Sequence, residues 1–231
     1  MAAEAPTVQL PRAIDEWLEA LEPASLAEIV GDPRTTALFS ADMVVGFCDH
    51  GALASPRIDA LTPVVVEVFE RMHALAVRDF VLLQDAHDPH ALEFEAFPPH
   101  CIISTEESQT IPELQALPFA ELFTVIEKNT LSPAPGTRFD PWLDAHADLR
   151  TAVIVGDCTD FCVYHAALHL RMRANAHRIA GFQVIVPANA VQTYHVDEGV
   201  EGAMAHDGDF FHAVFLYHMA LSGVRVVREL T

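Results

Sequence analysis

The stretch Ala152-Val-Ile-Val-Gly-Asp-Cys-Thr-Asp-Phe-Cys162, continuing as Val-Tyr-His-Ala-Ala-Leu-His-Leu-Arg-Met-Arg-Ala-Asn-Ala176, decides the fold. A short apolar run at 152–155, typical of a strand buried on both faces, passes through a polar loop into a helical pattern. The same alternation of apolar runs and longer helical patterns recurs from Thr36 onward, which indicates a parallel sheet wrapped by helices. We therefore predict an α/β protein.

The expected architecture is a three-layer α/β/α domain with a mainly parallel sheet of roughly six strands. Residues 1–35 are predicted to form a helical N-terminal extension, and residues 36–231 the main domain. An irregular insertion at 86–118 is a candidate functional segment, since long loops in compact domains usually carry function. The predicted strands are 37–41, 80–84, 123–127, 152–155, 184–187 and 224–227, and the predicted helices are 57–77, 140–146, 160–176 and 209–222.

Composition narrows the function classes. Thirteen Lys and Arg against 33 Asp and Glu give a net charge of −20, which would repel nucleic acid and anionic membranes alike. No apolar run approaches the roughly 18 to 20 residues of a membrane helix, and the start lacks a signal-peptide pattern, so we expect a cytoplasmic protein. The four cysteines form no C-x-x-C pair, which argues against a disulfide scaffold.

Chemically capable side chains follow the predicted strands. Asp42 follows the first strand, Asp85 and His87 follow the second, Lys128 ends the third, and the fourth leads to Cys162. Ligands of open parallel sheets bind beyond the carboxyl ends of the strands, so these groups are expected to converge. Lys128 is the only lysine, and an amine is a compact charge with a tunable pKa that arginine cannot replace.

Cys162 is predicted in the first turn of a helix, where free backbone N–H groups and the helix dipole favour a thiolate. The same N–H groups would stabilise an oxyanion if the sulfur attacked a carbonyl. Two interpretations are open from position alone: a nucleophile, or a small apolar residue packing the helix on the sheet. Cys158, in the same loop, is interpreted as structural.

Asp85, His87 and His100 supply one carboxylate and two imidazoles, a ligand set suited to zinc, iron or manganese with open positions. The alternative is a solvated acidic, histidine-rich loop. Whether Glu93 or Glu95 adds a ligand is left open.

The remaining histidine groups favour other roles. His165 and His169 are four residues apart on one helix, but the segment lacks the glutamate of a metalloprotease helix. A core or interface position is predicted for both. His206, His212 and His218 are expected to line packing surfaces or a subunit contact.

At these positions the chain resembles the isochorismatase-like cysteine hydrolases, and within them the nicotinamidases. The resemblance covers residues 36–190, about two thirds of the chain. Its most specific motif is the glycine-to-cysteine loop that follows the lone lysine. The matching motifs are Asp42-Met-x-x-x-Phe47, Asp85-x-His87 with Phe97-Pro-Pro-His100-Cys101, Glu127-Lys128, and Gly156-x-x-Thr159-Asp160-x-Cys162-Val163.

The resemblance implies a catalytic triad of Asp42, Lys128 and Cys162 in a cysteine hydrolase domain. Asp42 would act as general base and then acid, Lys128 would favour the charged forms of its neighbours, and Cys162 would form a thioester. Backbone N–H groups of Cys158 and Cys162 are the implied oxyanion donors. A cis peptide bond is implied between Asp157 and Cys158.

The resemblance also implies one divalent metal ion, zinc first, with iron or manganese as alternatives, held by Asp85, His87 and His100. In nicotinamidases this metal binds the pyridine nitrogen, and Phe47 and Phe97 would form the apolar slot for the ring. The implied activity is cleavage of nicotinamide to nicotinate and ammonia by a homo-oligomer. The alternatives are the same chemistry on another small amide of pyrazinamide, maleamate or ureido type, or a non-catalytic metal-binding protein.

The chain departs from the family pattern around the pocket. Polar residues usual after Asp42 are replaced by Val44, Val45 and Gly46, and an aromatic residue past the lysine is replaced by Leu131. These departures bear on substrate range more than on reaction class.

Overall fold

The computed structural model describes residues 10–201 and 203–231. Its centre is a seven-stranded sheet, in which the main path runs β3-β2-β1-β4-β5-β7 and β6 pairs with β4. Every strand pairing in it is parallel, as predicted. The strands are β1 (Thr36–Ala41), β2 (Asp79–Asp85), β3 (Phe123–Lys128), β4 (Thr151–Asp157), β5 (Gln183–Pro187), β6 (Val191–Gln192) and β7 (Arg225–Val227).

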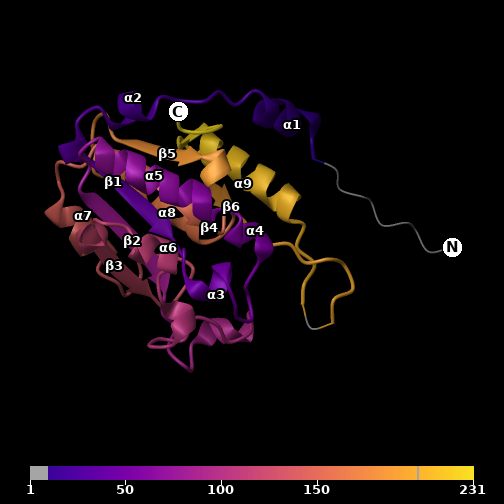
Figure 1. Ribbon diagram of the computed structural model, residues 1–231. Coiled ribbons are helices and arrows are strands. Elements are labelled where there is room, and N and C mark those ends of the chain that lie inside the picture. Colours follow the sequence, from indigo (N-terminus) through magenta and orange to yellow (C-terminus); the bar gives the residue numbers. More distant parts are fainter. Residues whose placement is uncertain (1–9, 202) are drawn as a thin grey trace.

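Helices cover both faces of the sheet and confirm the three-layer α/β/α architecture. Figure 1 shows α5 on one side of the sheet and α8 and α9 on the other. Two separate apolar clusters fill the two interfaces. The helices are α1 (Arg12–Glu19), α2 (Leu26–Val30), α3 (Val45–Cys48), α4 (Pro56–Asp59), α5 (Thr62–Ala74), α6 (Pro112–Gln115), α7 (Phe139–Ala145), α8 (Cys162–Ala176) and α9 (Gly208–Leu221).

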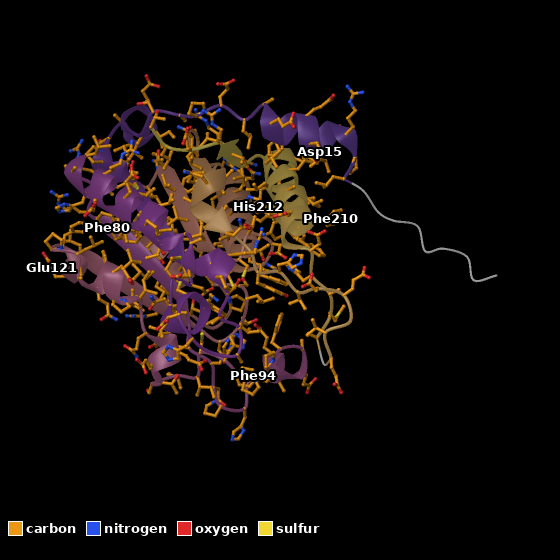
Figure 2. All side chains as sticks on the ribbon, turned by 45° about the vertical axis from the view of Figure 1, so that its right-hand side comes forward. Asp15, Phe80, Phe94, Glu121, Phe210 and His212 are labelled. Atoms are coloured by element: carbon orange, nitrogen blue, oxygen red, sulfur yellow. The ribbon has the colours of Figure 1, made fainter. Side chains whose placement is uncertain are left out.

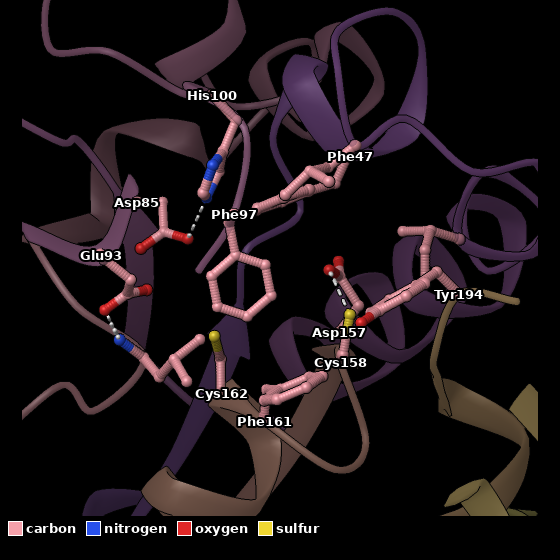
Figure 3. A pocket seen from close by; sticks show the side chains of 13 residues that line it. Phe47, Asp85, Glu93, Phe97, His100, Asp157, Cys158, Phe161, Cys162 and Tyr194 are labelled. Atoms are coloured by element: carbon pink, nitrogen blue, oxygen red, sulfur yellow. Dashed lines mark hydrogen bonds and ion pairs between the residues drawn. The ribbon is translucent and has the colours of Figure 1, made fainter. Parts of the chain in front are cut away.

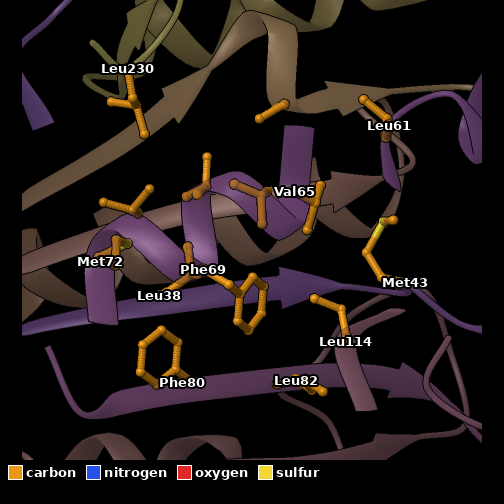
Figure 4. Packing of buried hydrophobic residues seen from close by; sticks show 14 of the residues in the cluster. Leu38, Met43, Leu61, Val65, Phe69, Met72, Phe80, Leu82, Leu114 and Leu230 are labelled. Carbon is orange, nitrogen blue, oxygen red and sulfur yellow. The ribbon is translucent and has the colours of Figure 1, made fainter. Parts of the chain in front are cut away.

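Successive side chains along a strand point to opposite faces of the sheet, so each strand contributes to the apolar clusters on both faces. In β1, Leu38 belongs to the cluster under α5, whereas Phe39 belongs to the cluster under α7 and α8. Phe69 of α5 stacks on Phe80 of β2 with ring centroids 5.4 Å apart, and both are fully buried (Figure 4). Burial of a side chain of this size contributes roughly 1.5–3 kcal/mol, so this layer fixes α5 on the sheet.

The predicted helix 57–77 is two helices in the structure. α4 ends at Asp59 and α5 begins at Thr62, with Pro63 in its first turn. Proline has no N–H to donate to the carbonyl four residues earlier, so one continuous helix cannot pass through this point. The sheet also has one more strand than predicted, because β6 is only two residues long and shows no periodicity.

The N-terminal segment packs on the C-terminal part of the chain. Trp17 of α1 contacts Tyr217 of α9 edge to face, with ring centroids 5.2 Å apart. Leu26 donates its backbone N–H to the carbonyl of Thr231 at 2.9 Å. The extension was predicted to be helical, and residues 10–35 contain the short helices α1 and α2; residues 1–9 lie outside the described residues.

The strand ends that carry the site are brought together by register. Asp85, the last residue of β2, pairs directly with Lys128, the last residue of β3. Ala41 of β1 pairs with Gly156 of β4, which has φ +105°, and a Cβ there would lie 2.0 Å from the carbonyl oxygen of Ala41. Only glycine allows the cysteine loop to leave β4 this close to β1. No helix in the described parts of the chain is long and apolar enough to cross a membrane.

Candidate active site

Lys128 is the centre of a buried polar cluster at the carboxyl edge of the sheet. Its Nζ lies 2.6 Å from Asp85 Oδ1 and 2.8 Å from Asp42 Oδ2. It also donates to the sulfur of Cys162 at 3.3 Å. All four residues are at most 5% exposed. The structure thus brings the three predicted triad residues together and adds Asp85 as a second carboxylate on the same ammonium group.

The two carboxylates differ in basicity. Burial alone would raise the pKa of Asp85, but the charge of Lys128 and the neighbouring imidazoles of His100 and His87 hold it below its usual value. Burial and the charge of Asp85 raise the pKa of Asp42 to about 6, against the opposing effect of Lys128. Burial alone would lower the pKa of Lys128, but Asp42 and Asp85 raise it well above its usual value. Asp42 is therefore the carboxylate better suited to accept a proton.

Asp42 is held rigidly by the strand ends. Its Oδ1 accepts from the backbone N–H of Asp85 at 2.7 Å, and its own N–H donates to the carbonyl of Leu83 at 2.8 Å. Its φ is +51°, an uncommon value for a residue other than glycine. This conformation turns the carboxylate toward Lys128 directly after β1.

Cys162 lies in the first turn of α8, as predicted, and is its first residue, but its thiol is not in the expected state. Burial and the charge of Asp42 raise its pKa well above the usual value, although Lys128 acts to lower it. The N-terminus of the helix favours the thiolate, but desolvation and the charges of two neighbouring carboxylates raise the pKa of the thiol by more than the helix lowers it. A nucleophilic role for Cys162 would therefore need a base. Two carboxylates are close enough to be candidates, because a carboxylate oxygen of Asp42, one of Asp85 and the Cys162 sulfur all lie within 4.8 Å of one another.

The loop between β4 and α8 is a tight turn around the carbonyl of Cys158. Phe161 and Val163 both donate their N–H groups to this carbonyl at 3.1 Å, and the Asp157–Cys158 peptide bond is cis. Within the described residues, the N–H groups of Cys158 and Cys162 donate to no backbone carbonyl. Both remain available to a ligand.

Asp85, His87 and His100 form a buried group whose ligand atoms lie within 4.8 Å of one another. His100 Nδ1–H donates to the carbonyl of Pro98 at 2.8 Å, and His87 Nδ1 lies 3.3 Å from Asn129 Oδ1. These contacts leave both Nε2 atoms directed at Asp85, at 3.4 Å for His87 and 3.8 Å for His100. Since the buried Nε2 of His87 has no hydrogen-bond partner, the group fits a divalent metal ion.

The two glutamates left open as extra ligands lie outside this group. Glu93 lines the adjacent pocket, and its Oε2 accepts from the N–H of Leu131 at 3.3 Å. Glu95 is exposed.

A mostly apolar pocket opens above Cys162 (Figure 3). Phe47 and Phe97, the two predicted pocket residues, both line it, as do Phe161 and Tyr194. Phe97 meets Phe161 edge to face with centroids 5.9 Å apart. The other lining residues are Leu53, Ile58, Asp85, Glu93, His100, Leu131, Asp157, Cys158 and Cys162.

Sequence reasoning did not identify Phe161, Tyr194 or Asn129 as site residues. Phe161 and Asn129 are each adjacent in sequence to a predicted catalytic residue, and this adjacency was a usable signal. Tyr194 follows the two-residue strand β6 in a segment without periodicity, so no pattern marked it.

The other histidines occupy positions around the site. His169 Nε2 lies 2.8 Å from Asp140, and the partly buried His165 follows Cys162 by one helical turn. On the C-terminal side, Figure 2 shows His212 on α9. His206 contacts Asp160, His212 contacts Thr159 and His218 contacts the hydroxyl of Tyr164.

The parallel three-layer fold, with an acid, an amine and a thiol buried together at its carboxyl edge, is the arrangement of a hydrolase. A model of the isochorismatase domain matches residues 36–215, and the chain belongs to this family. Nicotinamidase 1 of Arabidopsis thaliana is 28% identical over 220 residues, covering 88% of this chain and 89% of that protein. Together these similarities identify an amide hydrolase of the isochorismatase family.

Solved structures share the fold over most of the chain. N-carbamoylsarcosine amidase from Thermoplasma acidophilum has a TM-score of 0.64 and 26% identity, covering 84% of this chain and 96% of that one. Nicotinamidase from Bacillus subtilis has a TM-score of 0.62 and 25% identity, covering 84% and 99%. Pyrazinamidase of Pyrococcus horikoshii, solved in complex with zinc, has a TM-score of 0.65 and 22% identity, covering 84% and 99%.

Proposed function

We propose that this protein hydrolyses nicotinamide to nicotinate and ammonia through a thioester on Cys162. The observation that carries the proposal is the single ammonium of Lys128, in contact with Asp42, Asp85 and the sulfur of Cys162 beneath an aromatic pocket. The similarity to a plant nicotinamidase over most of both chains supports the choice of substrate.

In the first half of the reaction, Asp42 takes the thiol proton and the Cys162 sulfur forms a bond to the carboxamide carbon. Lys128 compensates the charge that develops on the sulfur. The free N–H groups of Cys158 and Cys162 stabilise the oxyanion. The carbon–nitrogen bond then breaks, Asp42 returns its proton to the leaving nitrogen, and ammonia departs from the thioester.

In the second half, Asp42 takes a proton from water and the resulting hydroxide adds to the thioester carbon. The carbon–sulfur bond breaks, the sulfur regains its proton from Asp42, and the nicotinic acid that forms loses its proton to solvent as nicotinate. A carboxyl group with pKa raised to about 6 suits this repeated exchange better than an ordinary aspartate, because it is closer to the working pH.

Asp85, His87 and His100 would hold a divalent metal ion beside the pocket. When bound, the ion supplies a ligand position for the pyridine nitrogen, which orients the ring. The oxygen and nitrogen donor set suits zinc, and equally iron or manganese. Zinc is present in the Pyrococcus horikoshii structure that shares this fold.

The pocket favours a flat, apolar ring. Phe47, Phe97, Phe161 and Tyr194 supply aromatic walls. Aromatic rings pack on such walls through offset or edge-to-face contacts, which would place a pyridine ring between the metal group and Cys162.

A second candidate is hydrolysis of a ureido compound by the same residues. The structural similarity to N-carbamoylsarcosine amidase, at 26% identity, favours it. A small aliphatic ureido substrate would leave the aromatic walls unused. Activity on nicotinamide and pyrazinamide should therefore exceed activity on N-carbamoyl amino acids or maleamate.

The test is ammonia release from nicotinamide by the purified protein, with and without chelation, beside Cys162→Ala. Cys48→Ala is the matched control, since Cys48 is a buried cysteine outside the pocket. We expect activity in the wild type and in Cys48→Ala, and loss in Cys162→Ala and after chelation. A metal-loaded wild type that releases no ammonia from nicotinamide would refute the substrate, and an active Cys162→Ala would refute the nucleophile.

A further inference from the structure

His206 and Asp160 form a second buried polar contact, behind the cysteine loop. His206 Nε2 lies 2.7 Å from Asp160 Oδ2, with side chains 7% and 2% exposed. On the other side of the ring, Nδ1 lies 2.9 Å from the carbonyl oxygen of Tyr194. Neither residue takes part in the proposed chemistry.

Both nitrogens of His206 face oxygen acceptors. The carbonyl of Tyr194 can only accept, so Nδ1 must carry a proton. Nε2 faces a carboxylate, so a second proton lies between His206 and Asp160, on the ring or on the oxygen. Either way the pair is neutral as a unit, which allows it to be buried without an uncompensated charge.

Aromatic stacking fixes the ring in this position. The His206 ring lies between Tyr194, with centroids 4.1 Å apart, and Phe211 of α9, with centroids 4.4 Å apart. The backbone of His206 also pairs with Val196 through two hydrogen bonds of 2.9 Å. His206 thus joins the cysteine loop, the segment that carries Tyr194, and α9.

The contact between His206 and Asp160 links His206 to the loop that carries the proposed nucleophile. Asp160 precedes the nucleophile by two residues and lies between Cys158 and Cys162, whose N–H groups are the implied oxyanion donors. A tether at this point sets the orientation of both N–H groups. Misplacement of such groups by about 1 Å can lower a rate by about 100-fold.

We propose that His206 is a positioning residue for amide hydrolysis, acting through Asp160 on the oxyanion-binding N–H groups of the cysteine loop. This inference rests on the proposed function. It assigns His206 no contact with the substrate. The bond to Asp160 should therefore matter for kcat, and the bond to Tyr194 should matter less.

Two amide substitutions separate the two bonds. The side-chain nitrogen of glutamine reaches roughly the place of Nε2, and that of asparagine roughly the place of Nδ1. His206→Gln keeps a donor to Asp160, whereas His206→Asn keeps only the donor to Tyr194. We expect His206→Asn to lower kcat by about 10- to 100-fold with KM changed less than about threefold, and His206→Gln to stay within about threefold of wild type in both.

His218→Asn is the matched control, because His218 lies on α9, is exposed and contacts Tyr164 instead of the cysteine loop. It should keep wild-type kcat. If His206→Asn does not fold, Asp160→Ala removes the carboxylate that Nε2 contacts and should show the same loss of kcat. Equal losses in His206→Gln and His206→Asn, or no loss in either, would overturn the positioning role.

A second measurement needs no amide substrate. Peptide mapping by mass spectrometry gives the rate at which iodoacetamide alkylates Cys162. We expect this rate to fall at least about fivefold in His206→Asn and to stay near wild type in His206→Gln, because the displaced N–H groups stabilise the thiolate less. If the wild type does not hydrolyse nicotinamide, the proposed function fails, and the alkylation rates still decide the role of His206: equal rates in both variants would overturn it.

Discussion

The Nζ atom of Lys128 lies 3.3 Å from the Sγ atom of Cys162, and both are buried. The same ammonium group contacts Asp42 and Asp85. Asp85 Oδ1, its contact at 2.6 Å, is also 3.4 Å from His87 Nε2 in the candidate metal group. Asp85 therefore belongs both to the polar cluster around Lys128 and to the candidate metal group. A change of charge in one group changes the electrostatic potential at the other.

Replacing Lys128 with methionine should both inactivate and destabilise the protein. In the metal-free protein, loss of the ammonium group would leave Asp42 and Asp85 as two buried carboxylates without the cation that contacts both, and breaking a buried pair in this way costs about 3–5 kcal/mol. Urea unfolding monitored by circular dichroism gives the change in free energy. The exposed Arg34→Met, which removes an ion pair with Asp32, should change it far less, because a solvent-exposed ion pair contributes little to stability. A Lys128→Met protein as stable as wild type would contradict the charge arrangement described here.

The two cysteines of the loop should respond differently to serine. In the proposed mechanism Cys162 contributes its sulfur and Cys158 only its N–H group. Cys162→Ser should lower kcat at least about 1,000-fold, whereas Cys158→Ser should stay within about tenfold of wild type. Steady-state ammonia release measures both. A large loss in Cys158→Ser with intact folding would show that the Cys158 side chain takes part.

The sequence was sufficient to predict the residues at the strand ends. Asp42, Lys128 and Cys162 converge because parallel strands place their carboxyl ends at one edge, and this follows from the parallel arrangement alone. The distances among them, and the shared Asp85, depend on register. The raised pKa of the Cys162 thiol was not predicted, because desolvation depends on packing that no local pattern encodes.

Contacts between residues far apart in the sequence also could not be predicted from the sequence pattern. His206 meets Asp160 from 46 residues away, and Arg57 donates to the carbonyl of Thr193 from 136 residues away. Both involve the segment that joins β6 to α9. His206 and His212 were predicted to line packing surfaces or a subunit contact, and their bonds to the cysteine loop became visible only in three dimensions.

Asn129 should tune metal affinity without binding the metal itself. Its Oδ1 lies 3.3 Å from His87 Nδ1 and accepts from the N–H of Asp88 at 2.8 Å, which orients the His87 ring. Loss of such a partner typically weakens metal binding 10- to 100-fold. Zinc competition with a chromophoric chelator should show this decrease in Asn129→Ala. His87→Ala should weaken binding further, and unchanged affinity in both variants would argue against the site.

His212 gives the fold a dependence on pH that is separate from the candidate metal group. Burial and the charge of Arg57 lower its pKa to about 4 from 6.5, so the ring is neutral in the folded protein. In this form Nδ1 shares a hydrogen bond of 2.8 Å with the Thr159 hydroxyl. The unfolded chain binds a proton at His212 below pH 6.5, and the folded chain does so only near pH 4. The contribution of His212 to stability is therefore complete above pH 6.5 and is lost as the pH falls toward 4.

His212→Asn isolates this contribution, because the asparagine oxygen can accept from Thr159 near the place of Nδ1 and has no proton to gain. A pKa lowered from 6.5 to about 4 corresponds to about 3 kcal/mol, so wild type should lose up to about that much more stability than the variant between pH 7 and pH 4. Urea unfolding at several pH values, with both proteins measured side by side, cancels the common contribution of the other histidines. Parallel stability curves for the two proteins would mean that His212 is not kept neutral by its surroundings. Curves that diverge below pH 6.5 would tie the acid sensitivity of the fold to the histidine that holds the cysteine loop from α9.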